Sequence, residues 1–124
     1  MCKLVENSFR DVNIAFANEL SMICDSAQVN VWELISLANR HPRVNILNPG
    51  PGVGGHCIAV DPWFLVENTK SGDTVRLARK INNERPSLIA QKLLSKLNGK
   101  KKVGILGIAY KPDVDDTRHS PAIS

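Results

Sequence analysis

Cys57 is the residue whose neighbours in the sequence best fit a reactive side chain. It ends a loop, residues 48–57, in which glycines permit positive φ angles and the close approach of a ligand, while prolines restrict φ. Asp61-Pro62, just beyond, is typical of a helix N-cap followed by proline at the first helical position. A sulfur placed before a helix N-terminus lies near unpaired N–H groups that favour the thiolate. The pattern indicates a nucleophile, with a small buried apolar side chain as the alternative reading.

Two helices are predicted ahead of this loop. From about Lys3 to Cys24, apolar residues recur at intervals of three and four, which predicts a long amphipathic helix. Asn30 followed by Glu33 has capping-box spacing, and we expect a second helix that stops before Pro42. Residues 43–47 are assigned to a loop. The expected buried stripe of the first helix is Phe9, Val12, Phe16, Leu20 and Ile23.

Further helices are predicted after the loop. Asp61 is expected to cap a short helix that Ser71-Gly72 ends, and Asp73 to cap the next one. Pro86 is expected to break that next helix, because a proline inside a helix removes a hydrogen bond and clashes with the preceding turn. A leucine-rich helical stripe then follows, closed by Asn98-Gly99.

The composition changes near Gly99 from helical to strand-like. Residues 102–108, KVGILGI, are a short apolar run that predicts a buried parallel strand. A single strand cannot bury itself, so we expect residues 100–124 either to pair with other chain or to be poorly ordered.

Charge and cysteine usage exclude several classes of protein. The net charge is +4, but the basic residues are spread along the chain and aromatic residues make up 5%, which argues against nucleic acid as a partner. We find neither an apolar run long enough to span a bilayer nor a start resembling a signal peptide, and we expect a cytoplasmic protein that does not bind membranes. Three cysteines without ligand spacing indicate neither a disulfide framework nor a metal site.

The run G-V-G-G-H-C-I-A-V-D-P-W-F at residues 52–64 resembles the catalytic-loop signature of the UDP-glucose/GDP-mannose dehydrogenase family. The resemblance implies three domains in a complete member: an N-terminal NAD-binding Rossmann domain, a central helical domain that forms a homodimer, and a C-terminal UDP-sugar-binding Rossmann-like domain. Residues 1–99 would be the central domain and residues 100–124 the start of the C-terminal one. The expected fold class is therefore mainly α, followed by the first strand of an α/β domain.

The resemblance also implies a reaction. Family members oxidise the C6 alcohol of a nucleotide sugar to a carboxylate in two hydride transfers to NAD. Cys57 would add to the intermediate aldehyde, because the resulting thiohemiacetal can lose a hydride and become a thioester that water hydrolyses. The same resemblance favours UDP-N-acetyl-D-mannosamine as substrate, with UDP-GlcNAc, UDP-GalNAc or UDP-glucose as alternatives. Since the G-x-G-x-x-G fingerprint for NAD is absent, the chain is expected to be inactive alone.

Three further catalytic residues follow from the resemblance. Lys3 and Asn7 match the family's K-x-x-x-N pair, and their spacing places them on one face of the first helix, where an ammonium and an amide can hold an oxyanion and a water. Asp61 matches an aspartate assigned to orienting or activating water. Outside the resemblance, Lys3 and Asn7 are ordinary solvated helix residues and Asp61 is an N-cap.

Four binding residues are carried over in the same way. Arg43 aligns with an arginine that reaches the substrate across the dimer interface, although its spacing to the loop varies in the family, and a helix-end cation is the alternative. Gly54 and Lys111 are assigned to the UDP-sugar, and Arg118 to the NAD side of the cleft. The last two lie in a segment similar to the family's K-P-x-x-x-D-D-x-R-x-S-P-A motif, whose plain alternative is a polar loop.

Two other functions stay open from the residues. The first-helix stripe, with two phenylalanines, also fits a helical dimerisation module without chemistry. A stand-alone cysteine hydrolase is disfavoured, because it needs a histidine base beside Cys57 and the side chain of the adjacent His56 generally points elsewhere.

Overall fold

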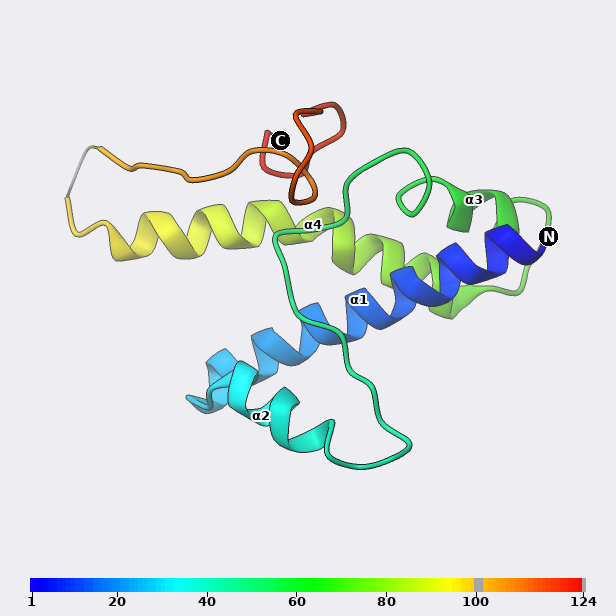
Figure 1. Cartoon of the computed structure of the whole chain (residues 1–124), viewed down its shortest axis with the longest axis horizontal. Helices are drawn as coiled ribbons and strands as arrows, with labels where there is room; N and C mark the ends of the chain where they lie inside the picture. The colour runs from blue at the N-terminus through cyan, green and yellow to red at the C-terminus, as the bar shows by residue number, and fades with distance from the viewer. Residues whose placement is uncertain (100–101, 124) are drawn as a thin grey trace.

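Four helices organise the chain in a computed structural model, which describes residues 1–99 and 102–123 (Figure 1). They are α1 (Cys2–Ala27), α2 (Val31–Ala38), α3 (Asp61–Val66) and α4 (Asp73–Lys96). The two long helices, α1 and α4, pack against each other, while α2 and α3 both contact α1. The mainly helical class predicted from the sequence is confirmed. None of the described helices is both long and apolar enough to cross a membrane.

Helices α1 and α4 run in the same direction. Pairs of contacting side chains join them in sequence order: Asp11 with Arg79, Ser21 with Arg85, and Asp25 with Lys92. All three pairs can form together only if the two helices keep one position along their axes. The α1–α4 interface therefore has one register. The long loop between α2 and α3 passes over this interface (Figure 1).

The predicted buried stripe of α1 is wrong for this chain. Phe9, Phe16 and Ile23 are 70%, 52% and 58% exposed, while the opposite face is buried and consists of small and polar residues. The periodicity was read correctly as helical, but the rule that apolar faces are buried assumes that the chain covers them itself. The buried residues of α1 are Asn7, Ser8, Asp11, Ala15, Ala17, Asn18, Ser21 and Cys24.

The second helix agrees with its prediction. The Asn30 side chain accepts hydrogen bonds from the N–H groups of Trp32 and Glu33 at 3.0 and 3.4 Å, so it is the N-cap of α2. After the helix, the Asn39 side chain exchanges two hydrogen bonds with the backbone of Ile46, at 2.9 and 2.7 Å. These bonds close the loop of residues 40–45 into a compact turn.

The two predicted aspartate caps are wrong. Asp61 is the first residue of α3 rather than its N-cap, which is Val60, and no side chain caps that end. Asp73 is likewise the first residue of α4, behind the N-cap Gly72 at φ +107°. Asp61 does not cap because its carboxylate is bound by Asn7 from α1. A left-handed glycine starts α4 because a Cβ on Gly72 would lie 2.6 Å from the Val66 side chain.

Pro86 does not break α4, contrary to the prediction. The helix continues from Asp73 to Lys96 with this proline inside it, and Figure 1 shows its two halves inclined to each other. An interior proline costs about 3 kcal/mol. Side chains on both sides of Pro86 bind α1, through Asn82 and Arg85 before it and Lys92 after it, and these contacts hold the helix together across the defect.

The predicted strand at 102–108 is not formed. Among residues 102–123 the structure has turns and extended chain but no strand, and Ile105 and Leu106 are 72% and 99% exposed. A strand needs a neighbour to receive its backbone hydrogen bonds, and the described residues offer none. The predicted start of the second domain at residue 100 and its end at 124 lie outside the described residues.

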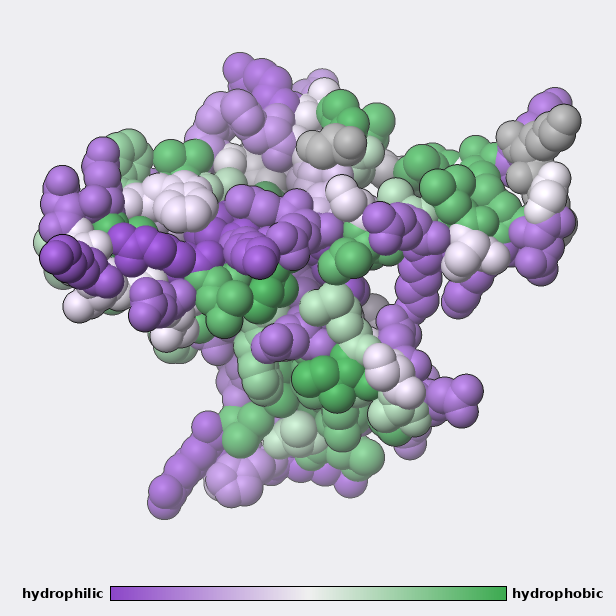
Figure 2. Space-filling view, turned by 180° about the vertical axis from the view of Figure 1, so that it is seen from behind, coloured by the Kyte–Doolittle hydropathy of each residue, from purple (hydrophilic) through white to green (hydrophobic). Residues whose placement is uncertain are grey.

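Apolar side chains remain uncovered in several places. Figure 2 shows hydrophobic surface over the C-terminal end of α4 with the segment that follows it, and over the region of α2. Trp32 and Leu94 are 56% and 65% exposed in these two regions. The described residues therefore cover only part of their own apolar surface.

Candidate active site

Cys57 is an exposed free thiol in the turn that leads into α3. Its carbonyl oxygen accepts the N–H groups of Val60 and Asp61 at 3.1 and 2.8 Å. These two bonds tie the backbone of Cys57 to the first residue of the helix. The sulfur and the Asp61 carboxylate therefore belong to one rigid turn.

Asn7 and Asp61 are brought together by the fold. Asn7 is 6% exposed, and its amide nitrogen donates a hydrogen bond of 2.5 Å to Asp61 Oδ2. Lys3, one helical turn earlier, lies instead at the surface, with its ammonium 3.8 Å from Glu6 and its side chain 71% exposed. Of the predicted pair, Asn7 is thus hydrogen-bonded to α3, whereas the ammonium of Lys3 pairs with Glu6.

The C-terminal segment, residues 108–123, packs on the glycine loop, residues 48–57. The Gly55 N–H donates to the carbonyl of His119 at 3.2 Å, and the imidazole rings of His56 and His119 are 4.4 Å apart in an edge-on arrangement. A Cβ on Gly54 would lie 2.6 Å from Tyr110 Cβ and 2.7 Å from the His119 carbonyl. Gly54 is thus required by the packing, because any side chain there would push the segment away.

Arg118 and Lys111 are exposed residues of this segment. Arg118 binds both carboxylate oxygens of Asp116 through Nε and Nη2, each at 2.9 Å, and its side chain is 76% exposed. Hydrogen bonds from the Arg118 side chain hold the pKa of Asp116 well below its usual range. Asp116 therefore orients a guanidinium that still faces solvent, as a ligand for an anion requires.

Arg43 is not part of the group around Cys57. With residues of α1 it lines a surface hollow of about 480 Å³. The turn that carries Arg43 and the turn that carries Cys57 lie on opposite sides of α1 in Figure 1. The other residues lining the hollow are Phe9, Arg10, Asn13, Asn45 and Leu47.

Residues 1–84 match the model of the central domain of the UDP-glucose/GDP-mannose dehydrogenase family. The chain belongs to this family. The match includes α1, α2, α3 and the glycine loop with Cys57, and it ends within α4.

Relatives of this chain in the UDP-glucose/GDP-mannose dehydrogenase family are named as nucleotide-sugar dehydrogenases. A UDP-N-acetyl-D-mannosamine dehydrogenase of Campylobacter jejuni is 59% identical over 126 residues, which cover 99% of this chain and 31% of that protein. An NDP-N-acetyl-D-galactosaminuronic acid dehydrogenase of Ralstonia solanacearum is also 59% identical, over 30% of its length. The chain thus spans about a third of the relatives that it matches.

Solved structures of family members have the same fold over this region. A UDP-D-ManNAc dehydrogenase from Pyrococcus horikoshii superposes with a TM-score of 0.90 at 50% identity, covering 99% of this chain and 31% of the other. The Staphylococcus aureus UDP-N-acetyl-mannosamine dehydrogenase Cap5O superposes with a TM-score of 0.86 at 49% identity, over 99% and 30%. The helical arrangement is therefore that of nucleotide-sugar dehydrogenases.

The sequence reasoning missed a buried polar network under the family's cysteine loop. Asp11 and Arg79, at 0% and 2% exposure of their side chains, form an ion pair of 2.6 Å between α1 and α4. Asn82 Nδ2 also donates to Asp11, to Oδ1 at 2.9 Å and to the carbonyl at 3.0 Å. Burial raises the pKa of Asp11, while the charge of Arg79 and the bond from Asn82 act against this rise.

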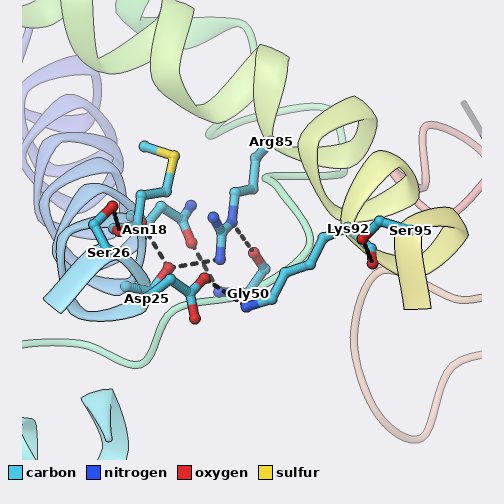
Figure 3. A network of polar contacts seen from close by, with 9 residues as sticks. Asn18, Asp25, Ser26, Gly50, Arg85, Lys92 and Ser95 are labelled. Atoms are coloured by element: carbon cyan, nitrogen blue, oxygen red, sulfur yellow. Dashed lines mark hydrogen bonds and ion pairs between the residues drawn. The ribbon is translucent and has the colours of Figure 1, made fainter. Parts of the chain in front are cut away.

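The network extends from this ion pair to Gly50, at the start of the loop. Asn18 Nδ2 donates to Asn82 Oδ1 at 2.9 Å. Asn18 Oδ1 accepts the Gly50 N–H at 2.8 Å (Figure 3). Arg85 donates from Nε to the Gly50 carbonyl at 3.1 Å and from Nη2 to Ser21 Oγ at 2.6 Å. A signal did exist in the sequence: the polar residues of α1 recur at helical spacing on the face opposite its apolar stripe, at 7, 11, 18, 21 and 25.

Proposed function

We propose that this chain is the central part of an NAD-dependent UDP-N-acetyl-D-mannosamine 6-dehydrogenase. Residues 1–99 act as the central helical domain and residues 100–124 begin the UDP-sugar-binding domain. The observation that carries the proposal is the exposed Cys57 in one rigid turn with Asp61, whose carboxylate Asn7 holds from α1. The relatives named as UDP-N-acetyl-D-mannosamine dehydrogenases support this substrate. A cytoplasmic location is part of the proposal.

Cys57 acts as the nucleophile of the second oxidation. Its thiolate forms a C–S bond to the aldehyde carbon, and the oxygen takes up a proton to give a thiohemiacetal. NAD, when bound, accepts the hydride in each of the two oxidations. Loss of the hydride and of the hydroxyl proton leaves a thioester on Cys57, and water cleaves its C–S bond to give the carboxylate and the free thiol. Exposure of the sulfur in this chain leaves room for a sugar to approach it.

Asn7, Asp61 and Lys3 act on two oxygen atoms of the reaction, that of the hydrolytic water and the oxyanion of the adduct. The hydrogen bond from Asn7 fixes the Asp61 carboxylate, which can then orient the hydrolytic water and accept a proton from it. Lys3 supplies positive charge for the oxyanion of the adduct. An exposed pair such as Lys3–Glu6 is worth only about 0–1 kcal/mol, so its ammonium can leave Glu6 at little cost once a negative oxygen is present.

The UDP-sugar and the cofactor are contacted from the loop and the C-terminal segment. Gly54 lets the sugar approach the backbone, and Lys111 supplies a point charge for the diphosphate. Arg118 reaches the NAD side of the cleft. Its exposed guanidinium, oriented by Asp116, has the chemistry to bind a phosphate there.

Arg43 completes the site of a second copy of the chain. It lies beside Phe9 on the face of α1 whose apolar stripe is exposed. Pairing of two chains through this stripe would bury the phenylalanines and bring Arg43 to the partner's surface. A homodimer therefore accounts for the exposed stripe and for the separation of Arg43 from Cys57 in one chain.

The proposal is tested with Cys57→Ser in the full-length enzyme. We expect formation of the sugar acid to be lost while UDP-sugar binding, measured calorimetrically, is kept, because serine is a far weaker nucleophile. Cys2→Ser, which changes another exposed cysteine, is the control and should leave acid formation unchanged. Undiminished acid formation by Cys57→Ser would exclude the covalent role. Comparison of kcat/KM for UDP-N-acetyl-D-mannosamine, UDP-GlcNAc, UDP-GalNAc and UDP-glucose decides the substrate.

A second candidate function is a dimerisation module without chemistry. The exposure of Phe9 and Phe16 favours it. If this is the whole function, the isolated chain sediments as a dimer and the full-length Cys57→Ser enzyme loses no activity. A strictly monomeric chain at high concentration counts against the module.

A further inference from the structure

Gly50, at the start of the cysteine loop, is held from two helices through both its N–H and its carbonyl. The N–H of Gly50 donates to Asn18 on α1, and its carbonyl accepts from Arg85 on α4 (Figure 3). We propose that Asn18 and Arg85 are positioning residues that set the path of the loop and thereby place the sulfur of Cys57. This inference rests on the proposed function only in taking Cys57 as the nucleophile.

The hydrogen-bond direction at Gly50 is dictated by a buried charge. The Asp11 carboxylate, paired with Arg79, accepts from Asn82 Nδ2, so that Asn82 Oδ1 faces Asn18. Asn18 must then turn its Nδ2 toward Asn82, which leaves its Oδ1 aimed at the N–H of Gly50. A flipped amide at either asparagine would oppose two donors or two acceptors in a buried site. The ion pair therefore selects one backbone orientation for Gly50.

Arg85 fixes the next peptide group, through the carbonyl of the same residue, Gly50. Its Nε and Nη2 groups reach two different acceptors, the Gly50 carbonyl and Ser21 Oγ, and Ser21 in turn donates to the Asn18 carbonyl at 2.7 Å. The planar guanidinium joins these acceptors at fixed geometry, which an ammonium on a flexible stem cannot do. The position of Gly50 is thereby fixed relative to both α1 and α4.

Few residues separate Gly50 from Cys57, and their backbone has little conformational freedom. At Gly52, with φ +136°, an added Cβ would lie 3.2 Å from Pro86 and 3.3 Å from the Asn82 carbonyl, so the backbone runs close along α4. At the far end, Asn7 holds Asp61. Because the segment between two anchors is short, a shift at Gly50 must be passed on to Cys57. A displacement of about 1 Å can lower a catalytic rate about 100-fold.

The test compares Arg85→Lys and Arg85→Gln with the control Lys92→Gln in the full-length enzyme. Lys92 lies on the same helix and pairs with Asp25 of α1. Its replacement therefore perturbs the α1–α4 interface without removing a contact to Gly50. We expect kcat to fall about 10- to 100-fold in Arg85→Gln, with a smaller fall in Arg85→Lys, while KM for the UDP-sugar and the thermal midpoint follow Lys92→Gln. If Arg85 serves folding alone, its variants will have a lower thermal midpoint but an unchanged kcat in the folded fraction. That result would overturn the proposal.

A chemical readout separates this proposal from the function of the enzyme. In a Cys2→Ser background, the rate of alkylation of Cys57 by iodoacetamide should differ between the Arg85 variants and Lys92→Gln, because the sulfur is displaced. Equal alkylation rates together with equal kcat values would refute the positioning role even if Cys57→Ser is inactive. Full activity of Cys57→Ser would refute the proposed function instead, and the alkylation rates would still decide whether Arg85 places the sulfur.

Discussion

Asn7 donates its side-chain amide to Asp61 over 2.5 Å, across 54 positions of the sequence. This bond joins the first turns of α1 to the beginning of α3, directly after the turn that carries Cys57. Asn7 is buried and Asp61 half-buried, so the bond is partly shielded from water. Through this bond α1 contacts the proposed reaction site.

Replacing Asn7 by leucine should lower both stability and turnover. The change leaves Asp61 without its donor, and a partly buried charged group that loses its hydrogen bond costs about 1–3 kcal/mol. We expect a loss of that size in the free energy of unfolding by urea, and a lower kcat. Ser26→Ala is the control, because Ser26 bonds an exposed carbonyl of the same helix. An unchanged kcat in Asn7→Leu would argue against the catalytic role.

The buried ion pair should be far more important for stability than the exposed one. Asp11→Ala leaves Arg79 buried and unpaired, and such a break costs about 3–5 kcal/mol. Asp25→Ala removes the partner of Lys92, and that exposed pair is worth about 0–1 kcal/mol. Denaturant unfolding of both variants measures the contrast. Equal losses would mean that the Asp11–Arg79 pair is open to water in solution.

The network also predicts a non-additive double mutant. Asp11→Leu and Arg79→Met each leave one buried charged partner alone, whereas the double variant leaves none. We expect the double variant to be more stable than at least one of the singles, because isolated buried charges are costlier than apolar replacements. Additive losses in the double-mutant cycle would contradict a direct coupling between the two side chains.

Gly54→Ala should detach the C-terminal segment from the loop. The new Cβ would lie 2.6 Å from Tyr110 Cβ and 2.8 Å from Pro121 Cδ, which real structures do not tolerate. Limited proteolysis should then cut within residues 108–123 faster than in the parent protein. Gly104→Ala is the matched control, because nothing lies within 4 Å of its Cβ position. Equal cleavage rates in the two variants would show that the segment does not pack on Gly54.

The exposed stripe of α1 predicts the behaviour of a polar variant. Phe16→Asp replaces a side chain that is 52% exposed in the single chain, so the fold itself should be little affected. If two chains pair through this face, the variant sediments as a monomer where the parent is a dimer, because a buried unpaired carboxylate opposes association. Leu94→Asp, an exposed position near the end of α4, is the control. A dimer that survives Phe16→Asp would move the interface elsewhere.

Local chemistry was sufficient to predict much of this chain from its sequence. The helical periodicity of α1, the Asn30 cap of α2 and the glycine loop before Cys57 each depend on residues a few positions apart, whose preferences act within one turn of backbone. The resemblance that led to the family was carried by the same short loop.

Only the tertiary structure decided which face of α1 is buried, what Asp61 does at the start of α3, and whether Pro86 ends a helix. Asp61 binds Asn7 instead of capping. Contacts with α1 carry α4 through its proline, from Asn82 and Arg85 before it and from Lys92 after it. Pairings of this kind are directional and link positions more than 50 residues apart, so no local preference specifies them. The polar face of α1 is buried because α4 supplies matching charges and amides, while its apolar stripe stays exposed because the described chain has nothing to cover it.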